Sequence, residues 1–244
     1  MHLRRFGLLG SLAVLPALAQ ATYEATVLAD HPIAYYQLSE PSGFPVALDS
    51  SGDGHTGTYE NFPVLGVPPL IVGTTNTAVD FTTGDAVIPN YTNLNFISGP
   101  FTIEAWINVD AFASKNIRVF DKSDAGYPLG YGFDVGANNV RLVGSVDFAP
   151  SFNLSIGTTY YIVGVSNGTG TGYIYVNGSL VSSGPYSSSE PYRNVAHIAV
   201  ASDGSSHFNG VIDEVAVYNY ALSAERISTH YEVGTGTAKF GGPQ

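Results

Sequence analysis

Residues 208–227 read Phe-Asn-Gly-Val-Ile-Asp-Glu-Val-Ala-Val-Tyr-Asn-Tyr-Ala-Leu-Ser-Ala-Glu-Arg-Ile. Apolar residues alternate through the first half of this stretch, which predicts a β-strand. Ser223 is a good N-cap and Glu225 suits the first turn of a helix, so a short helix follows and Gly234 ends it. Consecutive strand residues face opposite sides of a sheet. Asp213 and Glu214 are therefore expected on opposite faces, which excludes them as a catalytic pair.

The rest of the chain shows the same two-residue period. In residues 101–109, Phe101 and Ile103 share one face with the later apolar residues, whereas Glu104 and Trp106 share the other face with Asn108. Glycine-containing turns separate such segments every eight to twelve residues, which is typical of an antiparallel sandwich or barrel. The other predicted strands are 34–38, 78–81, 86–88, 117–121, 130–135, 140–146, 160–166, 173–176, 180–181 and 195–201.

Six segments, in order, resemble the laminin-G-like jelly-roll family: 34–43, 49–59, 78–81 with 101–108, 160–165, 173–178 and the closing stretch. The resemblance covers residues 25–234. It implies an all-β fold: an antiparallel two-sheet jelly-roll β-sandwich of the concanavalin A-like type, with one short C-terminal helix. Binding modules, adhesive domains and glycan-cleaving enzymes all use this fold, so the resemblance leaves the function open.

The first 21 residues have the features of a signal peptide. Arg4 and Arg5 precede an apolar run that is too short for a transmembrane helix, and Ala19-Gln20-Ala21 fits a cleavage site. We therefore expect a signal peptide over residues 1–21, a jelly-roll domain over 22–236 and a flexible tail over 237–244. The expected localisation is secreted, or extracellular.

Charge narrows the choice of partners. The chain has a formal net charge of −11, and removal of the first 21 residues leaves seven basic residues against twenty acidic ones. Such an excess of negative charge argues against nucleic acid and membrane surfaces as partners. It favours a neutral glycan or a glycoprotein. Cysteine is absent, so an exported domain must rely on its core or on a metal for stability.

Four sequons offer sites for N-glycosylation in a eukaryotic host and are chance matches in a bacterial one. They begin at Asn90, Asn153, Asn167 and Asn177.

An aromatic ring beside polar side chains is a common platform for sugar, which gives Glu104, Trp106 and Asn108 as candidate ligand-binding residues. The alternative is that the tryptophan is buried and the glutamate bonded internally. Tyrosine suits recognition loops, which adds Tyr127 and Tyr131 from the segment 127–132, and a second aromatic loop spans 185–192.

The resemblance also implies one structural Ca²⁺ near the edge of the sandwich. Calcium takes six to eight oxygen ligands. The glycine-rich loop that starts at Asp49 could supply carbonyl groups, and Asp49 and Asp213 could supply carboxylates. In the alternative, both carboxylates only accept hydrogen bonds from the backbone.

These observations predict a secreted, non-catalytic module that binds carbohydrate or glycoprotein ligands. One alternative is a glycan-cleaving enzyme of the same fold, with a lyase favoured over a hydrolase, because the acidic, apolar, acidic alternation of hydrolases is missing around Glu104. Another is a self-associating structural component of an extracellular matrix or filament.

Overall fold

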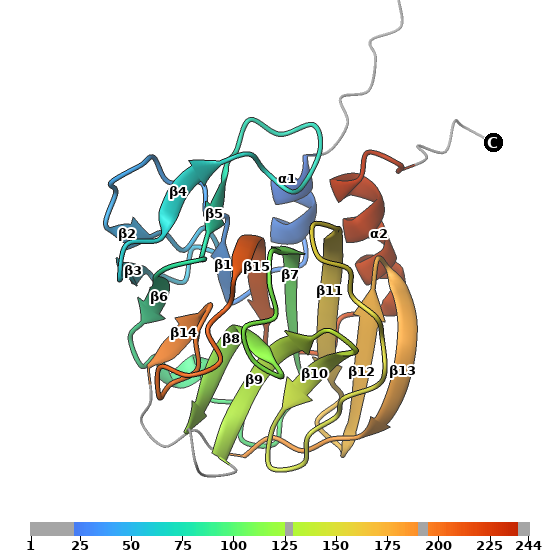
Figure 1. The fold of residues 1–244 in the computed structure, drawn as a ribbon. Helices are drawn as coiled ribbons and strands as arrows, with labels where there is room; N and C mark the ends of the chain where they lie inside the picture. Colours follow the sequence, from blue (N-terminus) through green and yellow to red (C-terminus); the bar gives the residue numbers. More distant parts are fainter. Residues whose placement is uncertain (1–21, 125–128, 190–194, 239–244) are drawn as a thin grey trace, which may run out of the picture.

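Two antiparallel β-sheets packed face to face form the molecule (Figure 1). The structure is a computed structural model that describes residues 22–124, 129–189 and 195–238. The first sheet has the strand order β13-β12-β11-β7-β15-β5-β4, with β1 also paired to β15. The order in the second sheet is β10-β9-β8-β14-β6-β3-β2. The predicted two-sheet jelly-roll architecture is confirmed.

The strands follow the predicted alternation closely in the second half of the chain. Three short strands before residue 70 were not predicted, because their few residues carry no clear period. The strands are β1 Ala34–Tyr36, β2 Val46–Ala47, β3 Gly57–Glu60, β4 Val64–Val67, β5 Ala78–Asp80, β6 Asp85–Ile88, β7 Phe101–Val109, β8 Ile117–Asp124, β9 Leu129–Gly136, β10 Asn139–Val143, β11 Thr159–Ser166, β12 Thr171–Val176, β13 Ser179–Pro185, β14 Ala196–Ile198 and β15 Gly210–Tyr218.

The C-terminal helix α2 spans Ala224–Gly234, as the sequence predicts, and the Ser223 side chain accepts a hydrogen bond from the Arg226 amide. A second helix was not predicted: α1, Tyr23–Leu28, is capped by Thr22. Its six residues are too few to show a helical period. A 3₁₀ turn, η1, spans Thr92–Leu94. No helix within the described ranges is long and apolar enough to cross a bilayer.

Both helices lie on the outer face of the first sheet (Figure 1). Beneath them is a second apolar cluster, separate from the main core between the sheets. It contains Trp106, Tyr161, Tyr175 and Tyr218 from the strands and Ile227 from α2. One sheet face therefore packs on the sandwich core, while the other packs on helices. This second layer decides which side chains of β7 and β15 can reach solvent.

Strand β15 contains a β-bulge that changes the expected direction of one side chain. Its register against β7 shifts between Asp213 and Ala216, and Glu214 has a φ of 54°. The extra residue lets Glu214 reach Tyr35 of the outer cluster, while Asp213 lies opposite Trp106 on that same face. The expectation that the two carboxylates face opposite sides is therefore wrong.

Candidate functional site

Glu104 and Trp106 lie where the alternation put them, on the outer face of β7, but they are not open to ligands. Glu104 is 0% exposed and Trp106 is 2% exposed. Helices α1 and α2 cover them, and the Trp106 Nε1 donates to the hydroxyl of Tyr23 at 2.9 Å. The predicted sugar platform at these residues is wrong, because nothing in the strand pattern reveals the helical layer. Asn108 is half-buried and donates to the Thr159 hydroxyl at 3.1 Å.

Glu104 is instead the centre of a buried hydrogen-bond network. Its carboxylate accepts from the hydroxyls of Tyr161 at 2.5 Å and Tyr218 at 2.8 Å. It also faces Nδ1 of His230 at 3.0 Å. A carboxylate, two phenols and an imidazole could serve acid–base chemistry, but every one of these groups is buried and bonded to another. The network holds helix α2 on the sheet.

His230 extends this network to the other helix. Its Nε2 lies 2.8 Å from Oδ2 of Asp30, which follows α1 and also pairs with Arg226 of α2 at 2.8 Å. Both ring nitrogens face carboxylate oxygens, so both must donate and the ring is an imidazolium. Burial opposes that charge, but Glu104 and Asp30 outweigh it and raise the pKa of His230 to about 9.

The two tyrosines predicted from the loop around residue 130 have different outcomes. Tyr131 is 0% exposed and packs in the main core, where its hydroxyl donates to the carbonyl of Leu94 at 2.8 Å. It therefore cannot contact a ligand at the surface. The sequence predicted Tyr131 both within the strand 130–135 and within a recognition loop over 127–132, and the structure shows it in the strand. Tyr127 lies outside the described residues.

A groove with the chemistry expected of a sugar site lies between α2 and the β12–β13 turn. Its volume is about 440 Å³, within the range of ligand pockets. It combines one aromatic ring with hydroxyl, amide and carboxylate groups, and we call it the α2 groove. Its lining residues are Asn177, Gly178, Ser179, Ser228, Tyr231, Glu232 and Thr237.

Tyr231 is the aromatic residue of the α2 groove. Its ring is half-buried and stacks on Trp106, with centroids 5.9 Å apart and planes 14° from parallel. Tyr161, the cross-strand neighbour of Trp106, lies 6.3 Å from Tyr231, with ring planes 21° from parallel. The Trp106 and Tyr161 rings lie 5.1 Å apart, so the three rings form one cluster in which Tyr231 is the ring that borders the groove. Trp106 thus supports the accessible ring rather than acting as one itself.

The opposite wall of the α2 groove is the two-residue turn Asn177-Gly178. Both residues have positive φ, 51° and 75°, which suits a tight hairpin. The Asn177 side-chain oxygen accepts from the Tyr161 amide at 3.0 Å, which fixes the turn to β11. A Cβ on Gly178 would lie 3.0 Å from Cβ of Tyr231, so the turn packs closely against this tyrosine.

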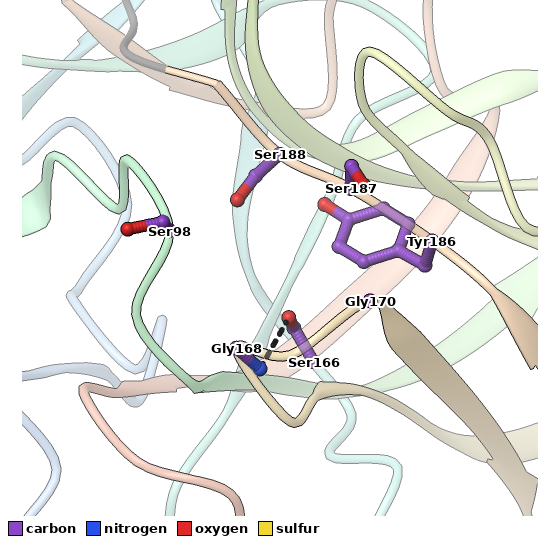
Figure 2. A pocket seen from close by; sticks show the side chains of 7 residues that line it. All are labelled: Ser98, Ser166, Gly168, Gly170, Tyr186, Ser187 and Ser188. Carbon is purple, nitrogen blue, oxygen red and sulfur yellow. Dashed lines mark hydrogen bonds between the residues drawn. The ribbon is translucent and has the colours of Figure 1, made fainter.

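A smaller cavity of about 80 Å³ lies among loops elsewhere on the molecule (Figure 2). Serine hydroxyls and glycine backbone surround it: Ser98, Ser166, Gly168, Gly170, Tyr186, Ser187 and Ser188. Tyr186, from the second aromatic loop predicted above, is 1% exposed and donates to the Val143 carbonyl. The cavity has room for only a few water-sized groups. The α2 groove is therefore the better candidate for an oligosaccharide.

Asp49 does not fit the expected calcium site. One of its oxygens accepts from the amides of Tyr35 and Ser51, and the other accepts from the Ser51 hydroxyl and the His55 amide, at 2.7–2.9 Å. The loop thus uses this carboxylate to order its own backbone. Asp213 accepts from Leu70 instead, so the expected pairing of Asp49 with Asp213 is not found.

Asp213 has a different acidic partner, Glu214. Both side chains are buried, and each has one oxygen without a hydrogen-bond partner. Burial raises the pKa of Asp213 to about 7, and burial next to Asp213 raises that of Glu214 well above its usual value. Glu214 borders a cavity of about 200 Å³ that is also lined by Glu24 and Asn76.

The outer face of the second sheet carries a different charged cluster. Asp134 accepts from Arg141 at 2.5 Å and from Arg118 at 3.1 Å. Arg118 also lies 3.1 Å from Asp121, and Arg141 pairs with the exposed Asp147. Both guanidinium groups are therefore committed to carboxylates of this chain, which leaves them poorly suited to neutralise a uronate in a lyase reaction.

Comparison with known proteins agrees with this architecture. A family model described as the concanavalin A-like lectin/glucanases superfamily matches residues 75–228. The chain belongs to this superfamily. No curated protein sequence gives a significant match. The superfamily includes both lectins and glucanases, so membership alone does not separate binding from catalysis.

Solved structures with the same fold are distant in sequence. Domain 4 of AbnA, an extracellular arabinanase of Geobacillus stearothermophilus solved with arabinotriose, has a TM-score of 0.60 and 15% identity; the match covers 82% of this chain and 98% of that domain. The binding domain of botulinum neurotoxin DC, solved with rat synaptotagmin II, has a TM-score of 0.59 and 14% identity, and the match covers 84% of this chain. The chain spans about half the length of that toxin domain, 52%.

Proposed function

We propose that this protein is a non-catalytic, extracellular module that binds a neutral glycan in the α2 groove. The observation that carries the proposal is the half-buried ring of Tyr231, which packs on Trp106 and Tyr161 and is surrounded by hydroxyl and amide groups. An aromatic face packs against the C–H face of a sugar ring, while the neighbouring polar groups bond to its hydroxyls. Free glycans and the glycans of glycoproteins both present sugar rings of this kind.

The polar groups of the groove suit a neutral sugar. Ser228 and Thr237 each offer a hydroxyl, and Asn177 offers the nitrogen of its amide. Glu232 is exposed and carries the only charge among the lining residues, all of which lie within the described part of the chain. A carboxylate accepts hydrogen bonds from sugar hydroxyls and repels an anionic glycan. The net negative charge of the whole chain also repels an anionic glycan.

Proteins with the same fold support a glycan-binding function, although they do not identify the ligand. One was solved with arabinotriose, and a botulinum neurotoxin of type C with this fold was described as depending on two ganglioside molecules for cell entry. A module that meets polysaccharides or cell-surface glycans works outside the cell. Secretion through the segment 1–21 is therefore part of the proposal.

The proposal is tested on an array of neutral glycans, followed by incubation of each hit and analysis of the products. The protein is produced in a bacterial host, because an N-glycan attached to Asn177 would fill the α2 groove. Binding without products is expected. New reducing ends or unsaturated uronate products would contradict a non-catalytic role, and the absence of any bound glycan would contradict the function as a whole.

We further propose that one Ca²⁺ stabilises the fold at Asp213 and Glu214. Their unpartnered buried oxygens suit a hard cation, and Asn76 lines the cavity that Glu214 borders. No group of three or more metal-binding His, Cys, Asp or Glu side chains occurs in ranges 22–124, 129–189 and 195–238. The remaining ligands would accordingly be neutral oxygens and water.

Chelation followed by titration with CaCl₂ tests this cation. At a hundredfold excess over Kd, a ligand of the native state adds about 2.7 kcal/mol to the free energy of unfolding. For a domain of this size, that corresponds to a rise in Tm of ~5–10 °C. The variant Asp213→Asn should lose the calcium response, whereas Asp203→Asn, an exposed control, should keep it. An unchanged Tm in chelator, together with no metal by elemental analysis, rules the cation out.

A further inference from the structure

Phe62 is an exposed aromatic residue at a strained turn. It lies between β3 and β4, and 93% of its surface is accessible to solvent. Phe62 has a φ of 63° and the preceding Asn61 a φ of 56°. Glycine and asparagine adopt this left-handed region readily, but a bulky residue does so rarely. A phenylalanine with an unfavourable backbone conformation and almost no buried surface contributes nothing evident to stability.

The turn that carries Phe62 is held firmly from behind. The Thr83 hydroxyl donates to the carbonyl of Phe62 at 3.1 Å, and the Asn61 side chain donates to Asp85 at 2.9 Å. A Cβ on Gly84 would lie 2.4 Å from the backbone nitrogen of Pro63, so the neighbouring turn packs tightly against this one. The aromatic ring is thus presented from a fixed backbone, which lowers the entropy lost on binding.

The surroundings of Phe62 narrow the kind of partner. Strand β4 is an edge of its sheet, but it is bulged between Leu65 and Val67 and is followed by two prolines. Such an edge resists the addition of another strand. The adjoining Glu60 is exposed, and the chain is acidic, which disfavours anionic membrane. A neutral sugar ring, whose C–H face packs on an aromatic ring, fits these limits best.

Phe62 and the α2 groove lie at opposite edges of the same sheet. Strands β4 and β13 are the two ends of the strand order, at the left and right of Figure 1. Six strand spacings of ~4.8 Å put them about 29 Å apart. A trisaccharide is too short to span that separation, whereas one polysaccharide chain can reach both. Two contacts on one chain raise the apparent affinity far above that of either contact alone.

From these observations we propose that Phe62 is a second sugar contact, which engages the polysaccharide whose other end lies in the α2 groove. This inference rests on the proposed function and extends it: the preferred ligand is a polymer rather than a short oligosaccharide. The affinity for the polymer depends on both aromatic residues, and the affinity for a trisaccharide depends on Tyr231 alone.

The test compares binding to soluble arabinan, xylan, mannan and β-glucan with binding to the corresponding trisaccharides. Phe62→Ala should weaken polysaccharide binding at least tenfold and leave trisaccharide binding unchanged. Ile156→Ala removes a different exposed apolar side chain, 59% accessible, and should change neither. Phe62→Gly removes both the ring and the backbone strain. It should bind as weakly as Phe62→Ala while its Tm is equal to or above that of the unaltered protein.

Three results would overturn the inference in distinguishable ways. If Phe62→Ala binds polysaccharide like the Ile156→Ala control while Tyr231→Ala does not bind, the second contact is wrong and the proposed function stands. If the unaltered protein binds none of the glycans, both fail together. Light scattering that shows a dimer lost only in Phe62→Ala would assign the ring to a second copy of this chain and overturn the sugar contact.

Discussion

At the residue scale, Glu104 shows how burial decides what a carboxylate can do. Strand alternation and chemical type both fit a binding or catalytic role, yet the side chain is 0% exposed. Three neighbours, Tyr161, Tyr218 and His230, satisfy its oxygens. A buried carboxylate with a charged partner is costly to disrupt, since removal of one partner leaves the other desolvated and unpaired.

Substitution Glu104→Gln should therefore destabilise the protein strongly. The amide keeps the shape of the side chain but removes the negative charge that faces the His230 imidazolium. The expected loss in free energy of unfolding is about 3–5 kcal/mol, measured by urea denaturation. Glu225→Gln, at an exposed position in the first turn of α2, is the control, with a cost of about 0.3–1 kcal/mol. Equal effects of the two variants would contradict the account of the network.

Residue positions within strands were predictable, but their surroundings were not. The two-residue period correctly put Glu104 and Trp106 on the face opposite Phe101 and Ile103. Burial of that face depends on contacts with α1, which the sequence did not reveal, and on the docking of α2. Likewise, the sequence placed Tyr231 only within the closing helix that ends at Gly234. Its role in a groove requires the β12–β13 turn, more than fifty residues earlier in the chain.

At the element scale, helix α2 links the core to the candidate site. Its buried side bears His230 in the network, and its last turn carries Tyr231 in the groove. Both helices are fastened by the chain of contacts from Glu104 through His230 to Asp30 and Arg226. The groove keeps its shape only while this attachment holds.

The attachment of α2 predicts a dependence of stability on pH. Native His230 keeps its proton up to a pKa of about 9, whereas an unfolded histidine releases it near pH ~6.5. The native state binds more protons in that interval, so stability falls as pH rises from about 6.5 to 9, by about 3 kcal/mol in all. Below about pH 6.5, His230 makes its full contribution to stability.

Lys122 has the opposite effect on stability above about pH 8. Burial lowers its pKa to about 8, so its contribution to stability rises with pH from there. The measurement is therefore the difference between the unaltered protein and His230→Gln, followed by urea denaturation from pH 6 to pH 9. This difference should shrink as pH rises. A difference that stays constant would show that His230 is neutral in the native state.

The last turn of α2 offers a second prediction at this scale. A Cβ on Gly234 would lie 2.3 Å from Cζ2 of Trp106, too close for the helix to keep its position. Gly234→Ala should cost about 1–3 kcal/mol of stability and weaken glycan binding, because Tyr231 shifts with the helix. Thr229→Ala, elsewhere on α2, should leave binding unchanged. Retained affinity in Gly234→Ala would contradict the dependence of the groove on helix docking.

At the scale of the whole molecule, the sequence supported the fold far better than the site. Alternation, turn residues and the capped closing helix predicted the two-sheet jelly roll, and the structure and family match confirm it. The bulge at Glu214 was invisible, because a one-residue insertion leaves no mark in an alternating pattern. The acidic pair, the buried network and the α2 groove all arise from long-range packing.

The most direct test of the central claim is the affinity of the unaltered protein and of Tyr231→Ala for the strongest neutral glycan ligand, measured by calorimetry. Tyr220→Ala is a matched control, since that ring is 36% exposed and lies outside the α2 groove. Loss of a central aromatic contact worth about 2 kcal/mol lowers affinity about 30-fold. We predict such a loss for Tyr231→Ala and none for Tyr220→Ala. Equal affinity for Tyr231→Ala and the unaltered protein would contradict binding in the α2 groove.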